Sequence, residues 1–254
     1  MNITVLVKLV PDLVEELTID SSGKALDTSF LRLIINEFDD HAIEQGILLK
    51  ERGGGQVTIV APDIEGVDDV LFTAAAKGAD HLVKLKGDFS SGVNNHALAR
   101  AFSAIVKGLQ PNLVLTGVQA NNDIDGSVGS LLAGYLDMPY VGYISGITID
   151  GAKLKVRKEY PGGLIAEMDV TQPAVLGIQA AEQPPRYVAV SKVRQMMKTT
   201  TIEEQSAPAL DLSGGPTVGR MFQPEATGRA TMITGNAEEV STKLVSLFKE
   251  LGVL

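Results

Sequence analysis

Four short apolar runs separated by helix-length segments constrain the fold of this chain more than any other feature. The runs lie at residues 3–7, 57–61, 81–85 and 113–116, and the segments between them carry apolar residues at helical spacing. Such runs are typical of strands buried on both faces of a parallel sheet, with a helix in each connection. The crossovers should be right-handed. The pattern predicts an α/β fold with a Rossmann-like, doubly wound, mostly parallel sheet.

Beyond residue 140 the alternation gives way to strands that follow one another directly. The expected strands cover residues 142–149, 152–158, 164–170 and 173–178. Two turn sequences separate the first three of them, Asp150-Gly151 and Pro161-Gly162-Gly163. Glycine-containing turns between apolar runs are typical of β-hairpins. The sequence therefore predicts a β-hairpin region next to the parallel sheet.

The C-terminal part of the chain loses this regularity. Residues 199–220 are rich in Thr, Ser, Pro and Gly without helical or strand periodicity, and a helix is expected to resume at Ala237. Long irregular segments are uncommon inside compact domains. We therefore expect this part to cross the surface or to wrap another chain. The predicted organisation is an α/β domain at 1–183, an extended arm at 184–236 and a C-terminal helix at 237–254.

The connection from Gly117 to Ser127 is the first candidate for a ligand site. It joins the strand at 113–116 to a helix expected at about 126–136. Where a parallel strand ends and a helix begins, unpaired N–H groups and the helix dipole favour an anion, most often a nucleotide phosphate. Gly126 and Ser127 suit a close backbone approach and a helix cap. An ordinary exposed connection with an N-cap has the same composition, so both interpretations stay open here.

Composition restricts the classes of function. The formal net charge of −9 opposes binding to a nucleic-acid backbone. The chain has no cysteine, which excludes thiol nucleophiles, disulfides and cysteine-ligated clusters. No apolar stretch reaches the length of about 18 residues that a membrane span needs. We expect a cytoplasmic protein without membrane insertion.

Catalytic patterns are missing from the sequence. His41, His81 and His96 stand alone, without the spacing of a metal-binding pair. Asp39 and Asp40 fall at the start of an expected helix, where carboxylates favour the positive end of the dipole. No serine stands in a nucleophile elbow. The chain is therefore not expected to be a self-sufficient enzyme, and no metal site is predicted.

Several segments together resemble the β subunit of the electron-transferring flavoproteins over nearly the whole chain. The segments are Val7-Lys8, Val10-Pro11-Asp12, residues 36–44, residues 76–80, residues 113–119, Gly162-Gly163-Leu164 and Pro184-Pro185-Arg186-Tyr187. Their order and spacing carry the resemblance, because none of them is diagnostic alone.

The resemblance implies a heterodimer with an electron-transferring flavoprotein α subunit. In this family the α subunit mainly holds a redox-active FAD, and the β subunit closes over it and binds a structural AMP. The expected fold is thus of the adenine-nucleotide-binding type. Electrons would come from a flavoprotein dehydrogenase and pass to a quinone oxidoreductase or a similar acceptor. The chain would be an electron carrier subunit.

The resemblance also implies a nucleotide site, carried over residue by residue. Its expected members are Leu6, Asn36, Phe38, Asp39, Pro62, Gly117, Gln119, Ala120, Asn121, Gly126, Ser127 and Val128. Main-chain amides at 126–128 would cradle the phosphate. Asp123 and Asp125 are poor neighbours for an anion, so we expect them to turn away or to accept bonds from loop amides.

The residue at position 128 leaves the identity of the bound nucleotide open. Many AMP-binding members have a threonine where this chain has Val128, which removes a hydroxyl donor. In the electron-bifurcating branch, which also uses NADH, a valine is usual there and a second FAD occupies the same pocket. The run Asn122-Asp123-Ile124-Asp125 departs from that branch, and residues 36–39 match the ordinary one. AMP is the preferred prediction, with FAD in the same pocket as the alternative.

The segment that begins at Arg186 resembles the family's partner-recognition loop. Arg186, Tyr187, Val190 and Lys192 are the expected partner-binding residues, with Val190 as the aliphatic anchor for the dehydrogenase. Leu13 falls where some relatives cover the flavin with an aromatic ring, so it is the expected flavin-proximal residue. The tail beyond residue 220 resembles an arm around the α subunit. A different class of protein, a universal-stress-type nucleotide-binding module, shares the strand-loop-helix site and stays open.

Overall fold

The computed structural model describes residues 1–89, 93–124, 126, 128–151, 153–224, 228 and 230–254. It divides the chain into two units, Met1–Arg220 and Met221–Leu254. The helices of the first unit are α1 (Glu37–Gly53), α2 (Val67–Lys77), α3 (Asn95–Leu109), α4 (Val128–Leu136) and α5 (Val190–Thr199). The second unit contains α6 (Ala237–Glu250).

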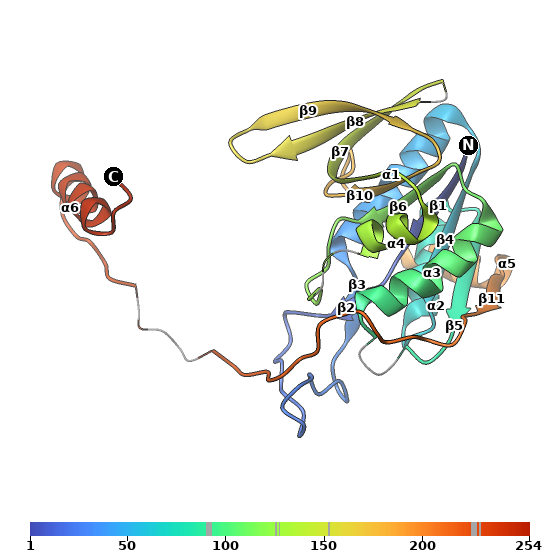
Figure 1. Cartoon of the computed structure of the whole chain (residues 1–254), viewed down its shortest axis with the longest axis horizontal. Helices are drawn as coiled ribbons and strands as arrows, with labels where there is room; N and C mark the ends of the chain where they lie inside the picture. Colours follow the sequence, from blue (N-terminus) through green and yellow to red (C-terminus); the bar gives the residue numbers. More distant parts are fainter. Residues whose placement is uncertain (90–92, 125, 127, 152, 225–227, 229) are drawn as a thin grey trace. The chain divides into compact units, whose positions relative to one another are not determined.

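The first unit is built on one large sheet (Figure 1). In the described residues its order is β11-β5-β4-β1-β6-β10-β7-β8-β9. The strands are β1 (Asn2–Leu6), β4 (Gln56–Pro62), β5 (His81–Lys86), β6 (Leu113–Gly117), β7 (Tyr140–Asp150), β8 (Lys153–Tyr160), β9 (Leu164–Thr171), β10 (Ala174–Ile178) and β11 (Ile202–Ser206). Pairing is parallel from β11 to β7, and antiparallel from β7 through β8 to β9. The predicted parallel sheet and hairpin region are confirmed.

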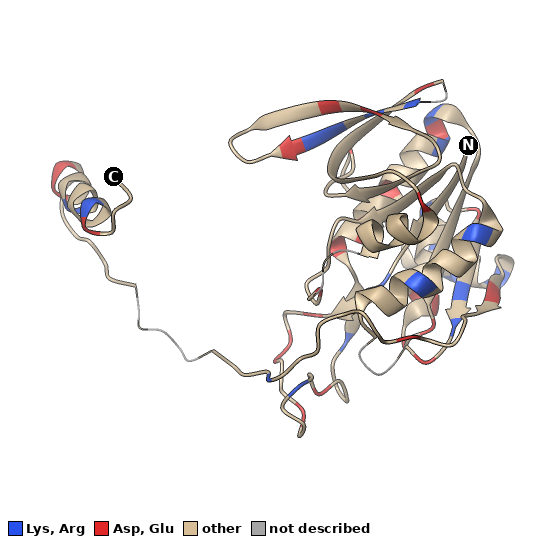
Figure 2. Ribbon diagram, viewed as in Figure 1, with Lys and Arg blue, Asp and Glu red and all other residues tan. Residues whose placement is uncertain are grey.

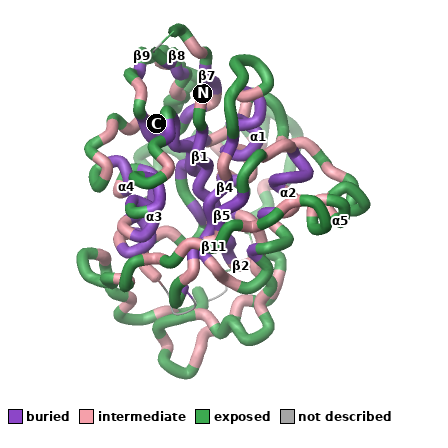
Figure 3. The backbone as a smooth tube through the Cα atoms, turned by 90° about the vertical axis from the view of Figure 1, so that its right-hand side faces the viewer, coloured by how far each residue is buried: buried purple, intermediate pink, exposed green. Residues whose placement is uncertain are grey.

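Both faces of the parallel sheet are covered, as its apolar strands require. Successive side chains of a strand point to opposite faces. Thus Ile3 and Val5 of β1 pack with α1 and α2, whereas Leu6 packs with α3 and α4 on the other face. Figure 3 shows the buried residues along these central strands and the inner sides of the helices, and Figure 2 shows few charged residues there.

The topology creates one switch point in the sheet. From β1 the chain continues outward through β4 to β5, and then returns to place β6 on the opposite side of β1. Ligands of open α/β sheets bind beyond the carboxyl ends of the strands at such a point. The crevice beyond Leu6 and Gly117 is therefore the position that this fold provides for a ligand.

Three parts of the structure differ from the sequence expectation. Residues 190–199 lie in the segment expected to be an extended arm, but they form the helix α5. Residues 202–206 lie in the segment expected to be irregular, but they form β11, which pairs with β5 at the edge of the sheet. An edge strand forms main-chain hydrogen bonds to a neighbour on one side only. In β11 Glu203 and Glu204 are exposed, so the sequence lacks the alternation of apolar and polar residues that would predict a strand. A small antiparallel pair, β2 (Leu9–Pro11) and β3 (Leu33–Ile35), was also not predicted, because three-residue strands give too little pattern.

The second unit is a short helical segment. Asn236 caps α6: its side chain accepts a hydrogen bond from the Glu239 N–H, and the Glu239 side chain accepts from the Asn236 N–H. This reciprocal capping box stabilises the first turn. None of the α6 residues is buried within the unit, and Leu247 and Phe248 of its apolar side are each 41% exposed.

Candidate nucleotide site at the switch point

The switch point contains a narrow cavity lined by six of the expected nucleotide-site residues. They are Leu6, Asn36, Asp39, Gly117, Gln119 and Val128. Leu6 and Gly117 end β1 and β6, Asn36 and Asp39 belong to the start of α1, and Val128 begins α4. Residues separated widely in the sequence thus meet at one place in the fold.

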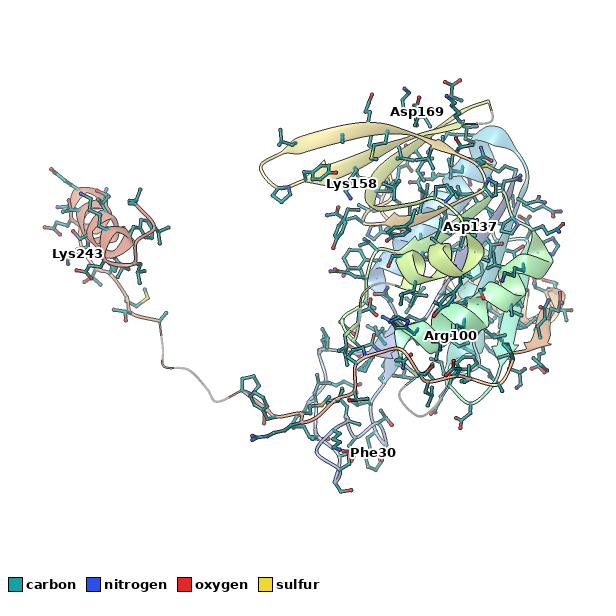
Figure 4. The ribbon with its side chains drawn as sticks, in the orientation of Figure 1. Phe30, Arg100, Asp137, Lys158, Asp169 and Lys243 are labelled. Carbon is teal, nitrogen blue, oxygen red and sulfur yellow. The ribbon has the colours of Figure 1, made fainter. Side chains whose placement is uncertain are left out.

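The other expected residues lie near this cavity without lining it. Phe38 approaches the backbone of Gly117, and Pro62 ends β4. Ala120, Asn121 and Gly126 line a second, open hollow of about 680 Å³, which shares Gln119 and Asp123 with the first cavity. That hollow also includes Lys158 of β8, which lies 5.7 Å from the centroid of the Tyr143 ring (Figure 4). Ser127 and Asp125 lie outside the described residues.

Gly117 allows the loop to pass close to α1. A Cβ atom at this position would lie 2.5 Å from Asp39 Oδ1, 2.7 Å from Phe38 Cβ and 2.9 Å from Asn36 Nδ2. Carbon atoms do not approach other heavy atoms so closely, so only glycine fits here without a shift of the backbone. The Asn36 side chain then donates a hydrogen bond of 2.9 Å to the Gln119 carbonyl and holds the loop against α1.

Asp39 joins the ends of the two strands on either side of the crevice. Its Oδ1 accepts from the Gly117 N–H at 2.7 Å, and its Oδ2 accepts from the Lys8 N–H at 2.9 Å. The residue is 5% exposed. Burial raises the pKa of the Asp39 carboxyl to about 6, although the two amide bonds, the Lys8 charge and Asn36 act in the opposite direction.

Asp123 organises the loop that follows β6. Its Oδ2 accepts from the Ala120 N–H at 2.8 Å, and its Oδ1 accepts from Asn95 Nδ2 at 2.8 Å. The same Oδ1 forms an ion pair of 2.5 Å with Lys8 Nζ. Asn95 also donates to the Gly126 carbonyl at 2.6 Å. The expectation that Asp123 accepts a bond from a loop amide is confirmed.

The cavity is closed in the isolated chain. Its volume is about 20 Å³, close to the space that a single water needs. Lys8 and Asp123, which line it, form the ion pair across it. Thr116 also lines the cavity, and its buried hydroxyl has no hydrogen-bond partner among the described residues. A buried hydroxyl without a partner is costly, so this group is available to a ligand.

Sequence reasoning did not select Lys8, Asn95 or Thr116 as site residues. Lys8 and Asp123 are 115 residues apart, and no local pattern reports such a contact. Lys8 does follow directly after an apolar strand in a segment that carries the family resemblance, which is the one signal that pointed to it.

The expected partner-binding residues lie at and before α5. Tyr187 is 88% exposed and Val190 is 61% exposed, and Lys192 is exposed as well. Arg186 differs, because its guanidinium is bonded to Glu44 and Glu51 of α1 within the same chain. Leu13, the expected flavin-proximal residue, is 61% exposed.

Two searches of the described residues bear on other kinds of function. No group of three or more His, Cys, Asp or Glu side chains in the described part of the chain has an arrangement that would hold a metal ion. Among the described helices, none combines the length and the apolar character needed to cross a membrane.

Comparisons with known proteins identify the class of this fold and site. The family model described as "Electron transfer flavoprotein domain" matches residues 26–210. Proteins named "Electron transfer flavoprotein subunit beta" are similar over nearly the full length. The one from Methylophilus methylotrophus is 31% identical, with 98% of each chain covered. Those from Clostridium acetobutylicum and Thermoanaerobacterium thermosaccharolyticum are 30% and 31% identical, with 98% and 96% of each chain covered.

The chain therefore belongs to the electron transfer flavoprotein β-subunit family. This family functions in electron transfer, and a β subunit implies an α subunit as its partner.

Proposed function

We propose that the chain is the β subunit of a heterodimeric electron transfer flavoprotein that holds a structural AMP. It accepts electrons from a flavoprotein dehydrogenase and passes them to a quinone oxidoreductase or a similar acceptor. The observation that carries the AMP part of the proposal is the cavity between β1 and β6, where the loop from Gly117 leads into the N-terminus of α4. The universal-stress-type alternative loses its support, since the family match covers most of the chain.

The groups around the cavity suit an adenylate. The Thr116 hydroxyl and the Lys8 ammonium are donors, and the positive end of the α4 dipole favours an anion. A cavity of about 20 Å³ does not contain a nucleotide. Under this proposal the ligand displaces the Lys8–Asp123 ion pair and moves the loop outward, while Asn36 and Gln119 lie beside the sugar or base.

The electron-transfer step depends on FAD, held mainly by the α subunit. When bound, FAD supplies the one- and two-electron chemistry that no side chain of this protein provides. The contribution of this chain is to cover the flavin and exclude water, and exposed Leu13 is the residue proposed to face it. Leu13 would contact the flavin through its aliphatic side chain.

A bifurcating carrier with a second FAD and NADH as a reactant is the alternative. Val128 favours it, because this side chain lines the cavity and packs into the apolar cluster, and it offers no hydroxyl. Thr116 favours AMP instead, since this residue lines the same cavity and its hydroxyl, without a partner among the described residues, would replace the missing donor.

Nucleotide analysis of the purified heterodimer tests the proposal. The complex is denatured with acid, and the released nucleotides are separated and quantified. One AMP and one FAD per heterodimer support the proposal. Two FAD and no AMP overturn it in favour of the bifurcating alternative, and a colourless homo-oligomer overturns both.

A second experiment tests the dehydrogenase surface. Val190→Ala should raise the KM for the dehydrogenase that reduces the wild-type heterodimer and leave the FAD content unchanged, because Val190 is exposed. The matched control is Val193→Ala, the same truncation at a half-buried position of α5. If Val190→Ala loses FAD, the residue instead holds the subunits together.

A further inference from the structure

Arg186 connects the base of α5 to α1 through every nitrogen of its guanidinium. Nε donates to Glu44 Oε2 at 3.1 Å and Nη2 donates to Glu44 Oε1 at 2.8 Å, while Nη1 donates to Glu51 Oε1 at 2.6 Å. The Arg186 main-chain N–H donates to Glu44 Oε2 at 3.0 Å. Two-point pairing of this kind fixes both the distance and the orientation of an arginine.

The interior position of Glu44 makes this connection structurally demanding. The Glu44 side chain is 2% exposed, whereas Arg186 is 30% and Glu51 is 51% exposed. A buried carboxylate without its cation is strongly unfavourable. The pairing with Glu51 and then Glu44 raises the pKa of Arg186, and Arg186 lowers the pKa of Glu51.

The residues before Arg186 are attached to the same helix. The Ala181 N–H donates to His41 Nδ1 at 3.2 Å, and the Glu182 N–H donates to Gln45 Oε1 at 3.1 Å. The path of the chain from β10 to α5 is therefore set by side chains of α1, and Arg186 is the last of these attachments before α5 begins.

α5 itself packs along one side against α2. None of its residues is buried, and Figure 3 shows it at the periphery of the domain. Met196 packs partly against the core, and β11 follows the helix into the sheet. β11 fixes the C-terminal end of α5 and α2 supports its side, so Arg186 is the group that ties its N-terminal end to α1.

We propose that Arg186 is a positioning residue, which locks α5 onto α1 and so presents the exposed side chains of α5 to the partner in one fixed arrangement. This inference rests on the proposed function, in which α5 faces the dehydrogenase. Under this inference Arg186 does not contact the partner directly. It acts from beneath the partner-binding surface, through its bonds to Glu44.

Hydrogen exchange on the intact heterodimer tests whether the bonds of Arg186 hold α5 in place, and it requires no dehydrogenase. Arg186→Gln should speed the exchange of the 190–199 amides by about tenfold or more, since local opening becomes easier, with the exchange of β1 and the FAD content unchanged. Glu44→Gln should reproduce the effect, although its side chain is buried and cannot touch a partner. Arg186→Lys should restore protection only in part.

Arg194→Gln is the matched control, because it removes an arginine from α5 that has no ion pair in the described part of the chain. Its exchange should equal that of the wild type. Unchanged exchange in both Arg186→Gln and Glu44→Gln would overturn the proposal.

The kinetics of electron transfer provide a second test, because they would not change if Arg186 only stabilised the fold. With a dehydrogenase that reduces the wild-type heterodimer, both Arg186→Gln and Glu44→Gln should raise KM by at least about fivefold with kcat nearly unchanged, since docking depends on preorganisation. A raised KM in Arg186→Gln alone means direct contact and overturns the positioning role. If no dehydrogenase reduces the wild type, the proposed function fails, and the exchange result alone decides whether Arg186 is the lock.

Discussion

The buried carboxyl of Asp39 makes the stability of this protein depend on pH in an unusual direction. Most carboxylates in proteins are stabilised in the charged form by their partners, and stability then falls as the solution is acidified. Burial raises the pKa of Asp39 from 3.8 to about 6. Its contribution to stability is therefore fully present below 3.8, and it is lost as the pH rises through about 6. Asp39→Asn removes this titration and keeps the shape.

The magnitude follows from the two pKa values. Their difference, from 3.8 to about 6, corresponds to about 3 kcal/mol at about 1.4 kcal/mol for each pKa unit. About half of it, some 1 to 2 kcal/mol, is lost between about pH 5 and pH 8. The pKa of about 6 already includes the hydrogen bonds from the Lys8 and Gly117 amides, which lower the pKa and oppose the effect of burial. The variant loses one of these two acceptors, which costs about 1 to 3 kcal/mol at every pH.

Urea unfolding of the wild type and Asp39→Asn, followed by circular dichroism from pH 5 to pH 8, measures the effect. The free energy of unfolding of the variant minus that of the wild type should increase by about 1 to 2 kcal/mol over this range. Only the change with pH matters, since the constant loss of an acceptor cancels. A difference that stays constant within about 0.4 kcal/mol would refute the raised pKa. A pKa below 3.8, with the two amides outweighing burial, would likewise leave the difference constant over this range, because Asp39 would stay charged throughout.

Three further substitutions test other parts of the fold. Gly117→Ala should destabilise the protein by about 2 kcal/mol or more, because its Cβ would meet Asp39 Oδ1 at 2.5 Å. The control Gly134→Ala, at an exposed site in α4 with open space around it, should stabilise the protein by about 0.5 to 1 kcal/mol. Urea unfolding compares the two variants. Phe102→Ala should cost about 3 to 5 kcal/mol in the same assay, because Phe102 is 1% exposed. Asn236→Ala removes the capping box and should cost α6 about 1 kcal/mol, seen as faster exchange of its first-turn amides.

The central part of the fold is predictable because its strands satisfy a strong physical requirement. β1, β4, β6 and β10 are covered on both faces, so nearly every residue must be apolar. β11 has no such requirement: it lies at an edge, and its charged side chains remain in solvent. The sequence therefore predicts the interior of the sheet well and its edge poorly.

The candidate site is predictable where it depends on strand ends and not where it depends on side chains that meet across the fold. Gly117 and Asn36 follow from the strand-loop-helix pattern and from the family resemblance. The ion pair between Lys8 and Asp123 requires β1 and β6 to be neighbours in the sheet, which only the topology establishes. The role of Arg186 inside the domain is hidden for the same reason, since Glu44 is 142 residues away.

The electrostatics of the switch point explain how an acidic site could retain an anion under the proposed function. Asp39 and Asp123 organise the backbone on either side of the cavity, and an adenylate would add negative charge beside both. Asp39 limits this conflict, because a carboxyl with a pKa of about 6 takes up a proton readily when an anion approaches. Lys8 limits it further, since it can exchange Asp123 for the ligand. Binding that requires an ion pair to open and a loop to move is slow to reverse, which suits a nucleotide with a structural role and would not suit a substrate that must turn over.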